Sequence, residues 1–364
     1  MKWQAGGATT PGMQLSTCND FSHRYRQRMN FRLVLLFFAG AFVVLLPLRS
    51  PAPLIYSPGE GWYYEQAGAT GKWTRTRAKD QLDVAEAAFK TKDYSTAMRA
   101  ARRVLKVWPL SDYAPRAQYL VGRCYEARGR DETAFDNYQE LLKKFPRTDN
   151  FDEVLQREYD IATRFYHGEF FRIFWGWLPL YTSMDETAKL YGKIVGNGPY
   201  STVAPRAQLQ VGAAREKEKN YEDAVKAYET AADRYNNQPA IAADAMYRTG
   251  VTYQKQATKG EYDQGKAGQA ISAYTDFITF YPDDKRVADA QKAIAALKIE
   301  QVRGSFLVAQ FYEKSKTLSA AQRRSGAVVY YNEVLQLDPN SPYAAQARQR
   351  IEALKPLLQT QPAS

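Results

Sequence analysis

Side chains that commonly serve as nucleophiles or metal ligands are scarce in this sequence. Its 364 residues include two cysteines, Cys18 and Cys124, and two histidines, His23 and His167. A structural zinc site needs about four such ligands, and Cys18 and His23 lie in a separate N-terminal segment. The rest of the chain therefore holds one cysteine and one histidine, which excludes a disulfide framework and argues against a zinc site.

Motifs for phosphate binding or hydrolysis are incomplete or missing. Residues 66–73 resemble a phosphate-binding loop, but Gln66 stands where the motif needs its first glycine, and Trp73 where it needs serine or threonine. No G-x-S-x-G, H-E-x-x-H or H-x-E motif occurs in the sequence. We therefore expect no catalytic residue, no metal and no cofactor, and we expect that the protein is not an enzyme.

The other candidates for chemistry have simpler structural explanations. Cys124 falls between Gly122 and Tyr125 on a predicted packed helix, so we expect a small core side chain and not a nucleophile. His167 directly precedes Gly168, and we expect it to end a helix, where a cation interacts favourably with the helix dipole.

Composition and charge are those of a folded globular protein. Hydrophobic residues make up 45% and charged residues 24% of the chain, and a mean hydropathy of −0.54 excludes a polytopic membrane protein. The net charge of +11 is distributed among interspersed acidic and basic residues. This mixed pattern argues against a nucleic-acid-binding surface.

The N-terminal region has the features of a secretory leader. Leu33–Leu48 is an uncharged run of 16 residues that follows four arginines, as in a signal peptide. As a helix it spans roughly 24 Å, short of a bilayer core of about 30 Å. A signal peptide is therefore favoured over an N-terminal membrane anchor across residues 29–52, although Pro53 would be unfavourable after the cleavage site. Residues 1–28 are then a disordered extension, or lie upstream of the true start at Met29. We expect the body to face an extracytoplasmic space, which is the periplasm if the source is a Gram-negative cell.

Internal repetition is the strongest signal in the sequence. The tetratricopeptide pattern has a small residue at position 8, aromatics at 11 and 24, alanine at 20 and proline at 32. Residues 115–146 fit all five positions, and five further segments fit in part. The small residues of the first helices are Ala85, Gly122, Ala162, Gly212, Gly250 and Ala309, and the alanines of the second helices are Ala97, Ala134, Ala188, Ala224, Ala270 and Ala327.

This repeat predicts the fold of the body. Small residues at positions 8 and 20 let two helices approach closely, and we expect the aromatics to fill the space between neighbouring hairpins. The sequence predicts an all-α fold over residues 78–356, a right-handed tetratricopeptide-repeat superhelix of five to six helical hairpins, with the first helices lining the concave binding side. Ser111 and Ser201, in the shared motif S-x-x-A-P-R-A-Q, are expected to cap helices, and residues 357–364 to form a flexible tail.

Two aromatic-rich stretches interrupt or precede the repeats. Residues 168–183 either elongate a helix pair and pack on the neighbouring repeat, or form an exposed patch that contacts a membrane or a partner. The aromatic residues of this stretch are Phe170, Phe171, Phe174, Trp175, Trp177 and Tyr181. Residues 53–77, which we call the strap, are rich in glycine and aromatics and form either a cap over the first repeat or a mobile ligand-binding arm.

The repeats and their ends resemble the BamD-like tetratricopeptide-repeat family of outer-membrane protein assembly factors. The resemblance extends over residues 80–354, most of the body. The segments that carry it are Ala97–Pro109, Tyr113–Pro146, Pro205–Tyr235 and the tail from Tyr330–Leu335 to Tyr343–Ala347.

This resemblance implies an adaptor on the periplasmic face of the outer membrane. Such proteins bind the barrel insertase (BamA) and unfolded outer-membrane proteins, and an arginine could pair with the terminal carboxylate of a client. The residues expected at this site by their place on first helices are Arg116, Tyr119, Arg123 and Arg157. The family's lipid-anchoring cysteine is missing and residues 168–183 are an insertion, so membrane attachment would come from the leader, the insertion or the partner.

A second class of protein also fits the repeat pattern. A periplasmic scaffold for cell-envelope or cell-division complexes, of the Tol–Pal coordinator type, would have the same fold. Such proteins typically carry an N-terminal coiled coil, and no sustained heptad pattern precedes Asp80 in this sequence.

Overall fold

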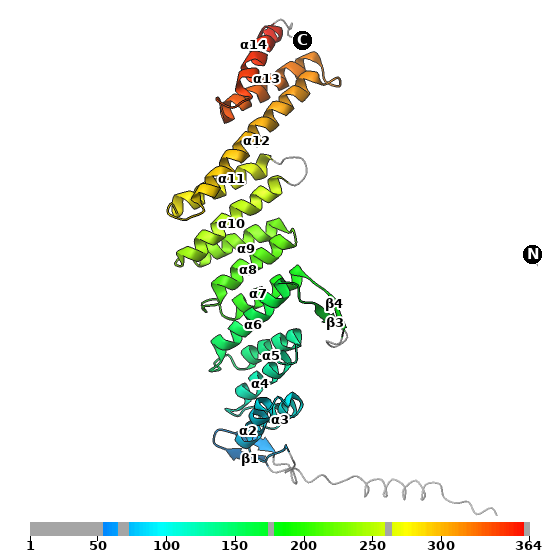
Figure 1. The fold of residues 1–364 in the computed structure, drawn as a ribbon, viewed down its shortest axis with the longest axis vertical. Helices are drawn as coiled ribbons and strands as arrows, with labels where there is room; N and C mark the ends of the chain where they lie inside the picture. The colour runs from blue at the N-terminus through cyan, green and yellow to red at the C-terminus, as the bar shows by residue number, and fades with distance from the viewer. Residues whose placement is uncertain (1–53, 65–72, 174–177, 259–263, 360–364) are drawn as a thin grey trace, which may run out of the picture. The chain divides into compact units, whose positions relative to one another are not determined.

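The computed structural model describes residues 54–64, 73–173, 178–258 and 264–359, which form thirteen α-helices and two β-hairpins (Figure 1). The expected leader, residues 29–52, lies outside these ranges. Among the described helices, none is long and apolar enough to cross a bilayer. The helices are α2 (Ala78–Lys90), α3 (Tyr94–Val107), α4 (Ala114–Glu126), α5 (Asp131–Lys144), α6 (Phe151–Tyr166), α7 (Met184–Asn197), α8 (Ala204–Lys217), α9 (Tyr221–Arg234), α10 (Pro239–Ala257), α11 (Gln264–Phe280), α12 (Val287–Lys314), α13 (Ala320–Leu337) and α14 (Ala344–Gln359).

The helices pack as consecutive hairpins, as the repeat predicted. The pairs are α2–α3, α4–α5, α6–α7, α8–α9, α10–α11 and α12–α13, and α14 packs on α13 (Figure 1). Most hairpins also contact the next one, so the buried side chains form a series of clusters along the chain. The prediction of an all-α tetratricopeptide-repeat fold of five to six hairpins is confirmed for the described residues.

Glycine at position 8 makes close helix packing possible within a hairpin. A Cβ atom at Gly122 would lie 2.4 Å from the Tyr138 ring, and one at Gly212 would lie 2.4 Å from the ring of Tyr228. The aromatic at position 24 therefore packs inside its own hairpin, on the glycine of the first helix. The expectation that this aromatic fills the space between hairpins was wrong, because the glycine leaves room for the ring within the pair.

Each of these buried tyrosines also has a polar partner on the first helix. In four hairpins the hydroxyl of the second-helix tyrosine donates a hydrogen bond to a side chain of the first helix. That side chain belongs to the residue four positions after the small residue of position 8. The pairs are Tyr138–Glu126 (2.7 Å), Tyr228–Glu216 (2.9 Å), Tyr274–Gln254 (2.8 Å) and Tyr331–Glu313 (3.0 Å). A buried hydroxyl without a partner is costly, so these bonds fix the register of the two helices.

Residues 168–183 do not elongate a helix pair, and that alternative was wrong. Helix α6 ends at Tyr166, and Gly168 has a positive φ of 108° that a helix cannot continue. The chain then forms a hairpin of β3 (Phe171–Ile173) and β4 (Leu178–Tyr181), and α7 begins after Ser183, whose side chain accepts from the Glu186 backbone N–H. The all-α range expected over residues 78–356 is therefore interrupted by this short hairpin, at the place where the sequence has its insertion.

Residues 54–64 of the strap form a second hairpin, of β1 (Leu54–Ser57) and β2 (Gly61–Tyr64). The buried carboxylate of Glu60, in its turn, accepts a hydrogen bond of 3.0 Å from the backbone N–H of Ala78, at the start of α2. The carbonyl of Gly59 accepts from the backbone N–H of Asp112 at 3.0 Å. These bonds favour a cap over the first repeat and not a mobile arm.

Two expectations about helix ends need correction. Ser111 does not cap α4, because its hydroxyl donates to the Trp108 carbonyl at 2.8 Å, and the N-terminal residue of α4 is Ala114. Helix α14 continues through Pro356 to Gln359, so the boundary expected after residue 356 lies inside a helix.

Candidate functional site

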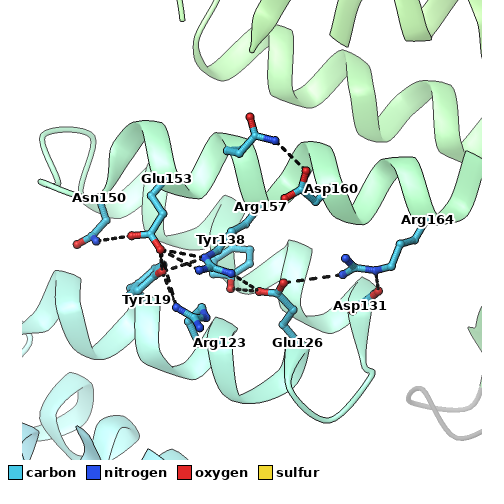
Figure 2. Close-up of polar contacts among 11 residues, drawn as sticks. Tyr119, Arg123, Glu126, Asp131, Tyr138, Asn150, Glu153, Arg157, Asp160 and Arg164 are labelled. Carbon is cyan, nitrogen blue, oxygen red and sulfur yellow. Dashed lines mark hydrogen bonds and ion pairs between the residues drawn. The ribbon is translucent and has the colours of Figure 1, made fainter. Parts of the chain in front are cut away.

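Three of the four side chains predicted for the site meet between α4 and α6 (Figure 2). Tyr119 and Arg123 are four residues apart on α4 and so share a face. The Tyr119 hydroxyl oxygen lies 3.0 Å from Arg123 Nη1 and 2.9 Å from Arg157 Nε of α6, both of which donate to it. Tyr119 is 9% exposed, so it serves to position the two arginines.

Arg116 lies outside this cluster. Its guanidinium forms an ion pair of 2.6 Å with Glu86 of α2 and is about two-thirds exposed. Arg206, at the same place in the motif shared by α4 and α8, bonds Gln156 of the preceding first helix at 3.2 Å. Contact with the preceding hairpin is therefore a repeated structural role, and the structure does not bring Arg116 together with the other three predicted residues.

Glu153 joins the cluster from the first turn of α6. It accepts hydrogen bonds from the Tyr119 hydroxyl, from Arg157 Nη2 at 2.9 Å and from Asn150 at 2.9 Å. Partial burial acts to raise the pKa of Glu153, but these hydrogen bonds and the charge of Arg157 outweigh it and lower the pKa to about 2. Burial, together with the hydrogen bond to Glu153, raises the pKa of Tyr119. The tyrosine is a hydrogen-bond donor here and not a base.

The cluster continues to Glu126 and Asp131 (Figure 2). Glu126 receives the hydroxyl of Tyr138 at 2.7 Å and lies 3.4 Å from Arg157 Nη1. Arg164, about two helical turns further along α6, pairs with the buried Asp131. Sequence reasoning missed these acidic partners. The available signal was the carboxylate four residues after the small residue of α4, which recurs in α8 and α12.

Part of this network is a repeated structural element. Each tyrosine-bound glutamate of a first helix also pairs with a basic residue of the next first helix. The pairs are Glu126–Arg157, Glu216–Lys255 and Glu313–Arg350. The role of Arg157 is therefore accounted for by packing between hairpins, and the same contact in other repeats argues against a binding role for this residue alone.

Arg123 is the member of the cluster that the repeat does not explain. Its guanidinium lies over the rings of Phe89 (5.4 Å) and Tyr119 (5.7 Å). The closest carboxylate paired with it among the described residues is Glu153, at 3.8 Å, beyond hydrogen-bonding distance. Its side chain is 30% exposed. Among the described residues, the side-chain hydrogen bond found for Arg123 is the one from Nη1 to the Tyr119 hydroxyl.

Arg123 borders a cavity of about 430 Å³. The residues that line it are Arg123, Glu126, Ala127, Gly129, Asp131, Arg157, Arg164 and Glu169. Arginines and carboxylates alternate around this cavity. An anion that enters it can therefore pair only with an arginine that no carboxylate of the chain already holds. Arg157 and Arg164 are held by Glu126, Glu153 and Asp131, which leaves Arg123 as the position for such a contact.

The aromatic patch predicted in residues 168–183 is smaller than expected within the described residues. Phe170 and Tyr181 are 53% and 44% exposed, whereas Phe171 is 4% exposed and stacks on Phe165 with ring centroids 4.2 Å apart. Phe171 is therefore a core residue, and its assignment to the patch was wrong. The other three aromatics expected there, Phe174, Trp175 and Trp177, lie outside the described residues.

Two further expectations for single residues are confirmed. Cys124 is fully buried, and burial raises the pKa of its thiol to about 11, which disfavours the nucleophilic thiolate. His167 is the residue that follows α6, where its backbone N–H bonds the carbonyls of Thr163 and Arg164.

The consecutive helical hairpins, with the hydrogen bonds and ion pairs that recur in them, define a tetratricopeptide-repeat protein. Residues 82–147 match the tetratricopeptide-repeat family model. Residues 186–337 match a second family, YfiO, described as an outer membrane lipoprotein. The chain is thus a tetratricopeptide-repeat protein whose later repeats resemble those of YfiO. No curated protein matches the sequence.

Solved structures with similar repeats share little sequence with this chain. YrrB, a repeat protein with an unusual peptide-binding site, is 16% identical over 59% of this chain and 92% of its own, with a TM-score of 0.31. A tetratricopeptide-repeat protein from Parabacteroides merdae is 11% identical over 76% of this chain and 98% of its own, with a TM-score of 0.31. MamA is 14% identical over 56% and 92%, with a TM-score of 0.32.

Proposed function

We propose that this protein is a non-enzymatic adaptor of the outer-membrane protein assembly machinery. In this role it binds unfolded outer-membrane proteins and the barrel insertase through its repeats, at the periplasmic face of the outer membrane. The observation that carries the proposal is the match of residues 186–337 to the YfiO outer membrane lipoprotein family. The earlier repeats, α2 to α6, would then be the part that receives clients.

Arg123 is the residue we assign to client recognition. A guanidinium with free donors suits a carboxylate, and the chain end of an unfolded protein carries one. Phe89 lies under the same guanidinium and offers a ring against which an aromatic terminal residue of a client can pack. Tyr119 and Glu153 hold Arg157 in place beside it, so the site presents one available cation and not three.

Attachment to the membrane remains part of the proposal. No cysteine lies at the end of the apolar run Leu33–Leu48, where a lipid anchor of the usual bacterial type would need one. The exposed rings of Phe170 and Tyr181, at the base of the β3–β4 hairpin, are suited to a membrane surface or to a partner. The leader and the insertase are the other two sources of attachment.

Peptide binding tests the recognition step. A short synthetic peptide that ends in phenylalanine is titrated by calorimetry in two forms, with a free C-terminal carboxylate and with a C-terminal amide. The wild-type protein should bind the carboxylate form about tenfold or more tightly, since a hydrogen bond to a charged group contributes roughly 1.5–3 kcal/mol. Arg123→Gln should remove this preference.

Arg116→Gln is the matched control. It removes the same charge from the same helix, at a position whose ion pair with Glu86 lies outside the cavity. This variant should keep the preference for the carboxylate peptide. Equal binding of the two peptides to the wild-type protein, or equal loss in both variants, would overturn the assignment of Arg123.

A further inference from the structure

A column of mostly polar side chains runs through the first helices, four residues before the small residue of position 8. Its members are Gln81 in α2, Gln118 in α4, Glu158 in α6, Gln208 in α8, Met246 in α10 and Ser305 in α12. All of them except Met246 are buried. A polar residue in this place must find a hydrogen-bond partner inside the protein.

The glutamines of α4 and α8 meet this need in the same way. Nε2 of Gln118 donates to the Asn137 carbonyl at 3.2 Å, and Nε2 of Gln208 donates to the Ala227 carbonyl at 3.0 Å. Both carbonyls belong to the second helix of the same hairpin, three residues after its position-20 alanine. The amide thus bridges the two helices of the pair.

Glu158 occupies this place in the α6–α7 hairpin with a carboxyl group. It is 0% exposed, and its Oε1 accepts from Gln139 Nε2 at 2.8 Å. Its Oε2 is buried and has no hydrogen-bond partner among the described residues. The carbonyl at the repeat-equivalent position of α7 is that of Tyr191, three residues after Ala188. An ionised carboxylate can only accept hydrogen bonds, whereas a carboxylic acid can donate one to a carbonyl, as the glutamine amide does.

The charged groups around Glu158 do not neutralise an ionised form. Burial raises the pKa of Asp136 of α5, a carboxyl group on which the charge of Lys193 also acts. Lys193 of α7 acts to lower the pKa of Glu158, but its ammonium lies over the Phe135 ring at 5.7 Å, and no ion pair joins it to Glu158 among the described residues. Burial dominates and raises the pKa of Glu158 to about 8.

We propose that Glu158 is held as a neutral carboxylic acid that replaces the bridging glutamine and donates from Oε2 to the Tyr191 carbonyl, and that its ionisation loosens the α6–α7 hairpin. The other five members of this column are Gln81, Gln118, Gln208, Met246 and Ser305, and none of them is an acid. The third hairpin, α6–α7, is therefore the part of the repeats whose packing depends on pH. Since α6 also carries Glu153 and Arg157, loosening it changes the support of the cavity, but the proposal does not depend on what that cavity binds.

The sign of the pH dependence follows from the shift. Between the ordinary pKa of 4.5 and the raised value of about 8, the folded chain binds a proton that the unfolded chain has lost. Stability therefore falls as pH rises through this window, and the contribution is fully present only below about pH 4.5. Replacement of Glu158 by glutamine removes this dependence of stability on pH and keeps a hydrogen-bond donor between α6 and α7.

Thermal unfolding of the full chain between pH 5 and 9 tests the proposal with two opposite substitutions. Glu158→Gln should melt about 2 °C or more above the wild-type protein at pH 9, with a difference that disappears towards pH 5. Gln208→Glu, which creates the same acid in the α8–α9 hairpin, should melt below the wild type at pH 9 and approach it at pH 5. A Glu158→Gln variant that is less stable at pH 9, or that fails to fold, would contradict the proposal, as would equal differences at all pH values.

A carboxyl titration gives a direct readout in the wild-type protein. With carbon-13-labelled glutamate, one side-chain carboxyl resonance should titrate with a midpoint near 8, and it should be absent from Glu158→Gln. If no glutamate carboxyl titrates above the ordinary range of the side chain, about 4 to 5, the neutral acid is excluded.

Discussion

Tyr138 shows how one residue serves both packing and polar satisfaction in each hairpin. Its side chain is fully buried, its ring lies on Gly122, and its hydroxyl reaches the half-buried carboxylate of Glu126. Glu126 in turn pairs with Arg157 of the next first helix. The tyrosine therefore connects the packing inside one hairpin with the charge pairing between two.

Replacement of Tyr138 should have a large effect on stability. Tyr138→Ala removes a fully buried aromatic side chain and should lower the free energy of unfolding by about 3 kcal/mol or more. Tyr138→Phe keeps the ring and loses the hydrogen bond to Glu126, with an expected cost of about 1 kcal/mol. Urea unfolding of the full chain measures both. A change within about 0.5 kcal/mol for Tyr138→Ala would mean that the repeat register is misplaced.

At the scale of the elements, the sequence indicated the helix pairs well and the irregular segments poorly. The spacing of small and aromatic residues from Gly122 to Pro146 is specific to a helical hairpin, and the structure has one there. The β3–β4 hairpin has strands of three and four residues. Strands this short do not show a recognisable alternation of apolar and polar residues, and the many aromatic residues of the segment hide it further. The tyrosine–glutamate bonds were overlooked because each joins two helices, although their spacing recurs along the chain.

Close approach of the two helices in a hairpin can be tested with paired glycine substitutions. Gly122→Ala places a Cβ 2.4 Å from the Tyr138 ring and should destabilise the protein by about 1–3 kcal/mol through overpacking. Gly192→Ala is the control, since nothing lies within 4 Å of its added Cβ in the middle of α7. This second change should stabilise the protein by about 0.5–1 kcal/mol.

Chemical unfolding of both variants gives opposite signs if the packing is as described. Loss of stability in both variants would instead point to a general intolerance of α4 and α7 to added side-chain volume.

At the scale of the whole molecule, ion pairs link successive first helices. These pairs decide which of the predicted site residues lie together, and the sequence alone does not reveal them. Arg116, Tyr119 and Arg123 are spaced to share one face of α4, but the guanidinium of Arg116 pairs with Glu86 of α2, whereas the Tyr119 hydroxyl accepts from Arg157 of α6. Helical spacing alone does not distinguish these neighbours, so Arg116 was grouped with the wrong residues. The acidic partners of the arginines come from α2, α4, α5 and α6. Pairing across helices is not visible in a single local pattern.

The central claim, that the protein is an adaptor of outer-membrane protein assembly, is tested most directly by its partners in the cell envelope. A tagged full-length chain is captured in detergent from separated inner and outer membranes, and all retained proteins are identified by mass spectrometry. We predict recovery from the outer membrane together with a large barrel insertase. Recovery from the inner membrane, with division or cell-wall proteins and without a barrel protein, would contradict the claim and favour a Tol–Pal-type scaffold.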